Sequence, residues 1–173
     1  TRDPKEILAA DKVVLPGVGS FGDAMENLHH FGLVPVIHQV VQEQTPFLGI
    51  CLGLQLLFEK SEESPGVEGL GILKGEILRI PAAEGLKIPH MGWNNIRFPN
   101  KGRLFAGVPE DAYVYFVHSY YLKAGREEDV TATTEYSALI HASVEHDNVF
   151  ACQFHPEKSS DTGLQILKNF VEL

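Results

Sequence analysis

The sequence of 173 residues predicts an α/β fold: a mostly parallel sheet with helices on both faces and an antiparallel extension. Residues 12–60 alternate short apolar strands with amphipathic helices, whereas residues 75–154 form a succession of strand-like segments separated by turn residues. No repeat, low-complexity tract or linker divides the chain. We therefore expect residues 1–173 to form a single domain.

The first half supplies the parallel part of the sheet. Each apolar strand is followed by a segment whose apolar residues recur at helical spacing, as Leu33, Ile37 and Val40 do. Such strand-helix alternation is typical of parallel strands, which need a crossover between them. The sequence predicts strands at 12–15 and 47–50, and helices at 21–30, 33–43 and 52–60.

In the second half, strands follow one another directly. Glu145-His-Asp-Asn148 has the composition of a hairpin turn, and Trp93, the only tryptophan, is expected in a loop between strands. This part predicts strands at 75–80, 95–98, 112–117, 130–134, 138–144 and 149–154, and a closing helix at 161–173.

Composition narrows the class of function. A net charge of −9 argues against nucleic acid or an anionic membrane as the main partner, since both attract basic surfaces. Two cysteines do not make a disulfide scaffold, so a reducing, cytoplasmic setting is expected. The eight histidines lack paired metal-ligand spacing, and neither a metal nor another cofactor is expected.

Cys51 lies between two glycines, after an apolar strand and before an apolar helix. This is the layout of a nucleophile elbow, a tight strand-to-helix turn that exposes a reactive side chain. Gly49 and Gly53 allow the backbone to crowd together there. The following helix should favour the thiolate of Cys51 through its unpaired N–H groups.

A cysteine nucleophile needs a base, and the base needs a group that orients it. Phe154-His-Pro-Glu157 supplies both types, because residues i and i+2 of an extended segment point to the same side. We predict that Cys51 attacks a carbonyl carbon, that His155 handles the proton, and that Glu157 fixes the imidazole tautomer. Cys152, in an apolar strand, is interpreted as a buried small hydrophobe.

Acyl transfer also needs donors for the developing oxyanion. The N–H of Leu52, directly after the nucleophile, is one candidate. The loop Pro16-Gly-Val-Gly19 follows another strand and can supply a second.

The elbow and the Phe154-His-Pro-Glu157 segment resemble those of class I (triad) glutamine amidotransferases, whose fold is flavodoxin-like. Three further segments are similar to the glutaminase subunits of imidazole glycerol phosphate synthases, in histidine biosynthesis: Leu15-Pro-Gly-Val-Gly-Ser-Phe-Gly-Asp-Ala-Met25, Ile88-Pro-His-Met-Gly-Trp-Asn94 and Tyr115-Phe-Val-His-Ser-Tyr-Tyr121. The likeness covers essentially the whole chain.

This resemblance implies that glutamine is hydrolysed through a γ-glutamyl thioester on Cys51, and that ammonia passes to a (β/α)₈-barrel cyclase subunit. It also implies that the Val18 N–H joins Leu52 in the oxyanion hole. The implied glutamine-binding residues are Gly17, Gln55, Ser119 and Tyr120, and the implied interface residues are His90, Trp93, Asn94 and Lys158.

The chain departs from the family at its start. Family members begin with a strand, a helix and a second strand that this sequence lacks, so an N-terminally incomplete domain is expected. We expect the absent first strand to lie inside the sheet, beside the strand that leads to Cys51.

Three alternatives stay open at this stage. The chain can be a glutaminase subunit of another amidotransferase, which the 15–25 and 88–94 segments disfavour. It can be a peptidase-like cysteine hydrolase, which would not require Gln55. It can also be an inactive docking subunit.

Overall fold

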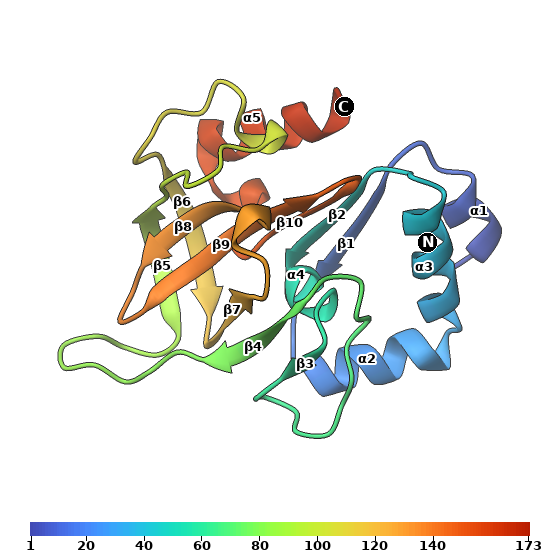
Figure 1. The fold of residues 1–173 in the computed structure, drawn as a ribbon, viewed down its shortest axis with the longest axis horizontal. Coiled ribbons are helices and arrows are strands. Elements are labelled where there is room, and N and C mark those ends of the chain that lie inside the picture. The colour runs from blue at the N-terminus through green and yellow to red at the C-terminus, as the bar shows by residue number, and fades with distance from the viewer.

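The computed structural model describes residues 1–173, which build a five-stranded sheet (Figure 1). The first three strands in spatial order are parallel, whereas the fourth pairs antiparallel with the third and the fifth pairs antiparallel with the fourth. In spatial order the strands are β1 (Val13–Gly17), β2 (Phe47–Cys51), β10 (Val149–Cys152), β9 (Leu139–His146) and β8 (Val130–Glu135). The predicted combination of a parallel part and an antiparallel extension is confirmed.

Helices cover both faces of this sheet. One apolar core lies between the sheet and α2 (Phe21–His30), α3 (Leu33–Gln42) and α4 (Leu52–Leu56). The other core lies beneath α5 (Ser160–Val171). All five residues of β2 are buried, because β2 contributes Phe47 to the first core and Leu48 to the second. The elbow therefore stands on a fully buried strand of the parallel part.

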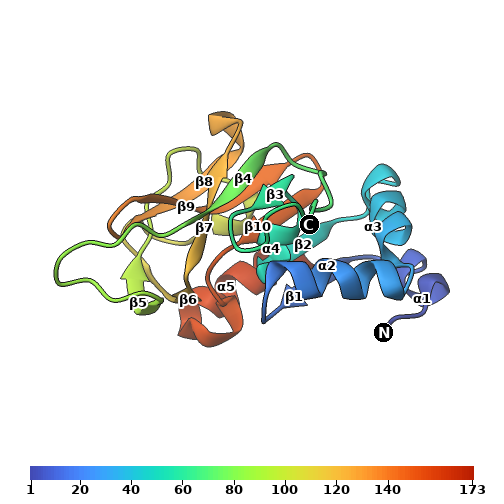
Figure 2. The same cartoon turned by 90° about the horizontal axis from the view of Figure 1, so that it is seen from below.

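Two smaller sheets complete the fold. β3 (Lys60–Ser61), β4 (Gly75–Arg79) and β7 (Tyr120–Ala124) form one of them, and β5 (His90–Asn95) pairs antiparallel with β6 (Tyr113–His118) to form the other. Figure 2 shows β5 and β6 at one end of the molecule and α1 (Pro4–Leu8) and α3 at the opposite end. Three short 3₁₀ helices span Arg103–Phe105, Glu127–Asp129 and Pro156–Lys158.

Several predicted elements and boundaries are wrong. Residues 90–95 form strand β5, so Trp93 lies on a strand and not in a loop, and residues 95–98 do not form a separate strand. Gly92 and the polar residues around it break the alternation of apolar and polar residues that is typical of a strand. For this reason β5 was not predicted from the sequence. Strand β7 and the short helix α1 were not predicted, and α4 ends at Leu56 rather than at residue 60.

The expected position of a further strand beside β2 is also wrong. β2 has β1 on one side and β10 on the other, so both of its edges are occupied. β1 pairs only with β2 and is half-exposed, which makes β1 the edge strand of this sheet.

No helix of the structure is both long enough and apolar enough to cross a membrane.

Candidate active site

Cys51 sits at the junction of β2 and α4 in a strained backbone conformation. Its φ and ψ are 57° and −111°, a combination that non-glycine residues rarely adopt. Close packing around it maintains this strain: a Cβ on Gly49 would lie 2.7 Å from the Gly53 carbonyl oxygen, and one on Gly53 would lie 1.8 Å from the Leu15 carbonyl oxygen. The predicted elbow geometry and its need for both glycines are confirmed.

His155 and Glu157 form a hydrogen-bonded pair, with 2.7 Å between the His155 Nδ1 and a Glu157 carboxylate oxygen. The expected reason was wrong, because residues 156–158 form a 3₁₀ helix and not an extended segment. The other ring nitrogen of His155, Nε2, is buried without a hydrogen-bond partner. A carboxylate at Nδ1 keeps a proton there, which leaves Nε2 free to accept one.

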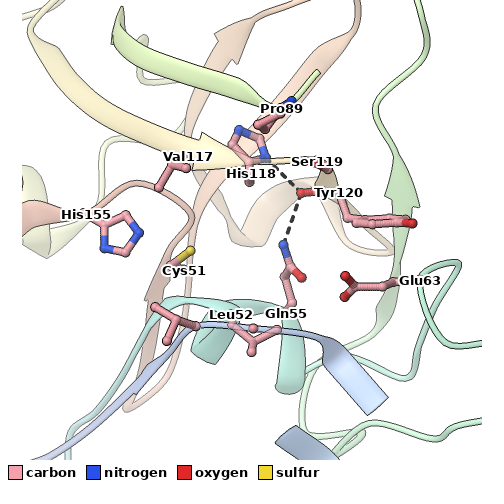
Figure 3. A pocket seen from close by; sticks show the side chains of 12 residues that line it. Cys51, Leu52, Gln55, Glu63, Pro89, Val117, His118, Ser119, Tyr120 and His155 are labelled. Atoms are coloured by element: carbon pink, nitrogen blue, oxygen red, sulfur yellow. Dashed lines mark hydrogen bonds between the residues drawn. The ribbon is translucent and has the colours of Figure 1, made fainter. Parts of the chain in front are cut away.

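A cavity of about 330 Å³ brings Cys51 and His155 together (Figure 3). These two residues are more than a hundred positions apart in the sequence: Cys51 ends β2, and His155 lies in the segment after β10. The cavity is lined by Val18, Gly19, Cys51, Leu52, Gln55, Glu63, Pro89, Val117, His118, Ser119, Tyr120 and His155. Its volume suits a ligand of amino-acid size.

The protonation of Cys51 differs from the prediction. Burial raises the pKa of the Cys51 thiol from 9.0 to about 11, and this effect outweighs the Leu52 N–H bond, which lowers that pKa. Helix α4 has only five residues and does not reverse this balance. Cys51 is therefore a thiol at neutral pH and needs a base to become a nucleophile.

The residues that carry the two predicted oxyanion donors, Leu52 and Val18, both line the same cavity. The Leu52 N–H lowers the pKa of the adjacent Cys51 thiol, and Val18 is 84% exposed. Gly17 does not line the cavity, contrary to expectation. It packs behind it, where a Cβ would lie 3.0 Å from the Leu52 Cβ.

Gln55, Ser119 and Tyr120 line the cavity as predicted. The Gln55 amide nitrogen donates to the Tyr120 carbonyl (3.1 Å) and to the Gln153 side-chain oxygen (2.9 Å), which fixes the orientation of the Gln55 amide. The Ser119 carbonyl accepts from the Ile80 N–H at 3.0 Å. Gln153 also approaches the Cys51 sulfur, with its amide nitrogen 3.7 Å away.

Sequence reasoning missed Glu63, the only carboxylate that lines the cavity. Figure 3 shows the Glu63 carboxylate across the cavity from Cys51, near Gln55 and Tyr120. One carboxylate oxygen accepts from the Phe21 N–H at 2.9 Å. Glu63 lies in a stretch with loop composition, 61–66, so only the fold reveals its position.

The predicted interface residues differ in how far they are exposed. Trp93 is 52% exposed and Lys158 is exposed, whereas His90 is only 3% exposed and packs inside the molecule. A direct contact between His90 and a partner therefore stays a prediction, because His90 does not reach the surface of the chain alone. Asn94 is half-buried, and its amide nitrogen donates to the Glu135 carbonyl at 3.0 Å.

Cys152 is fully buried in the core beneath α5, and burial raises the pKa of its thiol well above the usual value. It does not line the cavity. The interpretation of Cys152 as a buried small hydrophobe is confirmed.

The chain resembles known proteins over its whole length. Residues 2–173 match the family model of glutamine amidotransferase class-I. The chain is 57% identical over 173 residues to the imidazole glycerol phosphate synthase subunit HisH of Moorella thermoacetica, covering 100% of this chain and 81% of that protein. It is 49% identical to the subunit of the same name from Methanocaldococcus jannaschii, covering 100% and 86% of the two chains.

Solved structures support the fold. A glutamine amidotransferase crystal structure matches with a TM-score of 0.72 at 19% identity, covering 99% of this chain and 85% of that one. The structure of PurLQS from Thermotoga maritima matches with a TM-score of 0.67 at 18% identity, covering 93% and 79%. With the sequence matches above, these results show that the chain belongs to the class-I glutamine amidotransferases and, among them, to the family of imidazole glycerol phosphate synthase subunit HisH.

Proposed function

We propose that Cys51, His155 and Glu157 are the residues with which this chain, the glutaminase subunit of an imidazole glycerol phosphate synthase in histidine biosynthesis, hydrolyses glutamine to glutamate and ammonia. One observation carries the assignment: the unpartnered, buried Nε2 of His155 belongs to a residue that lines the same cavity as the Cys51 thiol. A buried nitrogen without a hydrogen-bond partner lowers the stability of the fold. A role as the base that accepts the Cys51 proton accounts for its presence.

The reaction begins with proton transfer from the Cys51 thiol to the His155 Nε2. The sulfur attacks the side-chain amide carbon of glutamine and forms a tetrahedral intermediate. His155 then returns the proton to the amide nitrogen, and the C–N bond breaks to release ammonia and leave a thioester on Cys51. A water molecule, losing a proton to His155, hydrolyses the thioester to glutamate and restores the thiol.

Two backbone N–H groups are proposed to stabilise the oxyanion, that of Leu52 and that of Val18. The Leu52 N–H belongs to the residue directly after the nucleophile and lowers the pKa of the Cys51 thiol, next to which the substrate oxygen must lie. Val18 belongs to the exposed loop after β1, which borders the cavity. Each such donor contributes about 3 kcal/mol to the transition state.

The remaining polar groups of the cavity fit the amino-acid end of glutamine. The Glu63 carboxylate is the natural partner of the α-ammonium group, because it is the only acidic group there. Gln55, Ser119 and Tyr120 line the same cavity as Glu63 and are proposed to complete the binding of that end. The cavity thus has an anionic end for the ammonium group and a thiol end for the amide.

We further propose that the chain docks on a (β/α)₈-barrel cyclase subunit, which receives the ammonia. The outward face of β5 and β6 supports this: Met91, Trp93 and Tyr113 are 62%, 52% and 59% exposed. We call these three residues the docking face. Large exposed apolar side chains on one sheet face are typical of an interaction site.

Lys158 lies beside this surface, because its 3₁₀ helix packs against β6. Lys158 and the neighbouring Asn94 are proposed to add polar contacts at the rim. Docking would give ammonia a dry route, in which it stays unprotonated and nucleophilic. A cytoplasmic, reducing setting belongs to the same proposal, because it keeps the Cys51 thiol free.

The test is glutamine turnover by the purified chain, with and without the cyclase subunit. Glutamate release that depends on Cys51 and rises with the cyclase subunit supports the proposal. Docking without glutamate release would favour the alternative of an inactive docking subunit. Hydrolysis of a peptide panel but not of glutamine would favour a peptidase-like hydrolase.

A further inference from the structure

His90 and His118 face each other across the β5–β6 pair, and neither is assigned a role in the chemistry above. They are register partners, and 2.9 Å separates the His90 Nδ1 from the His118 Nε2. Both rings are buried, at 3% and 6% exposure. Polar side chains this deeply buried need defined partners.

The contacts continue in both directions from this pair. The His118 Nδ1 lies 2.8 Å from the Tyr120 carbonyl oxygen, the same oxygen that accepts from the Gln55 amide (Figure 3). At the other end, the His90 Nε2 lies 3.3 Å from the Asn94 amide nitrogen. An unbroken series of hydrogen bonds therefore connects Asn94, next to Trp93, with Gln55 in the glutamine cavity.

Only one arrangement of protons satisfies this series. The Tyr120 carbonyl only accepts, so the His118 Nδ1 carries a proton, and in the neutral ring the His118 Nε2 accepts. The His90 Nδ1 must then donate to it, and the His90 Nε2 accepts from Asn94. Burial lowers the pKa of His118 to about 3 and that of His90 to about 4, so both rings are neutral, as this arrangement requires.

The surroundings of His90 hold its ring in place. The ring stacks between Phe116 and Tyr136, with centroid distances of 4.7 and 3.9 Å. Residues four apart on a regular strand are about 13 Å apart, yet the Asn94 side chain reaches back to His90. Gly92 lies between them with a φ of 127° and no side chain in the way.

We propose that His90 and His118 are positioning residues that link the surface beside the docking face to the Tyr120 carbonyl, and so to the Gln55 amide that binds glutamine. The inference rests on the proposed function of the cavity. His118 donates to the Tyr120 carbonyl, which also accepts from the Gln55 amide. His90 donates to the other ring nitrogen of His118 and so fixes the tautomer of His118. A partner that moves β5 changes the donor to Tyr120 without touching the substrate.

The first test compares two variants of His118 in the complex with the cyclase subunit. In His118→Asn, the amide nitrogen takes the place of Nδ1 and still donates to Tyr120. In His118→Gln, that donor is lost. We expect the KM for glutamine to rise about fivefold in His118→Gln, the effect of one hydrogen bond, with kcat within about twofold, and to stay near wild type in His118→Asn.

Thermal unfolding of both variants separates positioning from folding. If the KM changes follow the melting temperature rather than the presence of the donor, or if the two variants have the same KM, the positioning role is wrong.

The second test needs no activity, and so it distinguishes failure of this inference from failure of the proposed function. In ¹⁵N-histidine NMR spectra of the full chain, both His90 and His118 should carry their proton on Nδ1. Asn94→Leu should shift the ring signals of His90 and the side-chain amide signal of Gln55. A proton on Nε2 of either ring, or an unmoved Gln55 signal, would overturn the proposal even in a chain that hydrolyses glutamine.

Discussion

The elbow around Cys51 and the β5–β6 pair are built by different means. At the elbow, the packing of the backbone fixes the geometry: Gly49 and Gly53 allow a contact so close that Cys51 must adopt a strained conformation. In the β5–β6 pair, hydrogen bonds between side chains fix the geometry, because the buried His90 and His118 occupy opposed strand positions.

This difference explains why the two regions are held with different rigidity. A nucleophile must be held in one place, and a dense backbone junction does this without any mobile group. A series of neutral hydrogen bonds is more easily disturbed, because the loss of one donor leaves the next group without a partner. Changes at the rigid elbow should therefore have larger effects than changes on the docking face.

The largest effect is expected for Cys51→Ala. Removing the sulfur should reduce glutamine hydrolysis by on the order of 10⁴-fold or more, because no covalent intermediate forms. Synthesis by the complex from added ammonia should stay nearly intact, measured as product formation at saturating ammonium. Cys152→Ala is the matched control, since it removes the other buried thiol outside the cavity. Equal loss of both activities in Cys51→Ala would contradict its role.

His155→Ala should lower glutamine turnover by about 10² to 10⁴-fold, the usual contribution of general acid–base catalysis. Glu157→Gln should cost less, because the Glu157 side chain is 48% exposed and an amide oxygen still accepts from the ring. Steady-state glutamate release measures both variants. A loss of less than tenfold in His155→Ala would point to a different base.

The buried Cys51 thiol should make the stability of the free chain depend on alkaline pH. Its pKa is raised to about 11 in the folded protein from an unfolded value of 9.0, so folding favours the protonated thiol. That contribution is complete below pH 9 and is lost as pH rises towards 11, at most about 3 kcal/mol in the free energy of unfolding.

Urea unfolding between pH 8 and 11 measures this effect, with Cys51→Ala as the reference that keeps the contribution of Cys152. The alkylation rate of Cys51 by iodoacetamide should likewise keep rising beyond pH 9. An alkylation rate that levels off near neutral pH would instead favour the helix-stabilised thiolate that the sequence suggested.

The smallest effect on the stability of the free chain is expected for a change on the docking face. Trp93→Ala should weaken binding of the cyclase subunit by about 30-fold, the equivalent of a 2 kcal/mol anchor residue, while leaving the melting temperature unchanged. Calorimetric titration measures the affinity. Leu164→Ala on α5 is the control, because Leu164 is an apolar residue on another element and is at least as exposed as Trp93. Similar affinities for both variants would remove Trp93 from the interface.

The elbow was predictable from sequence because its cause is local. Gly49, Cys51 and Gly53 stand within five residues, between an apolar strand and an apolar helix, and the structure reproduces that order. The pairing of His155 with Glu157 was predictable for the same reason, although the 3₁₀ helix that brings it about was not.

The remaining features depend on residues that are far apart in the chain. Glu63 enters the cavity from a loop whose composition indicates only a turn, and His90 and His118 meet only because β5 and β6 pair. The Cys51 thiol illustrates a conflict of effects: a helix end and burial act in opposite directions, and only the packed structure shows that burial dominates.

The most direct test of the account is covalent trapping in the cavity. A glutamine analogue with an electrophilic centre in place of the side-chain amide should modify a single cysteine, found by peptide mapping at Cys51, and excess glutamine should protect it. His155→Ala should slow the modification strongly. Modification at Cys152, or modification of Cys51 that glutamine does not slow, would contradict the claim that this cavity is the glutamine site.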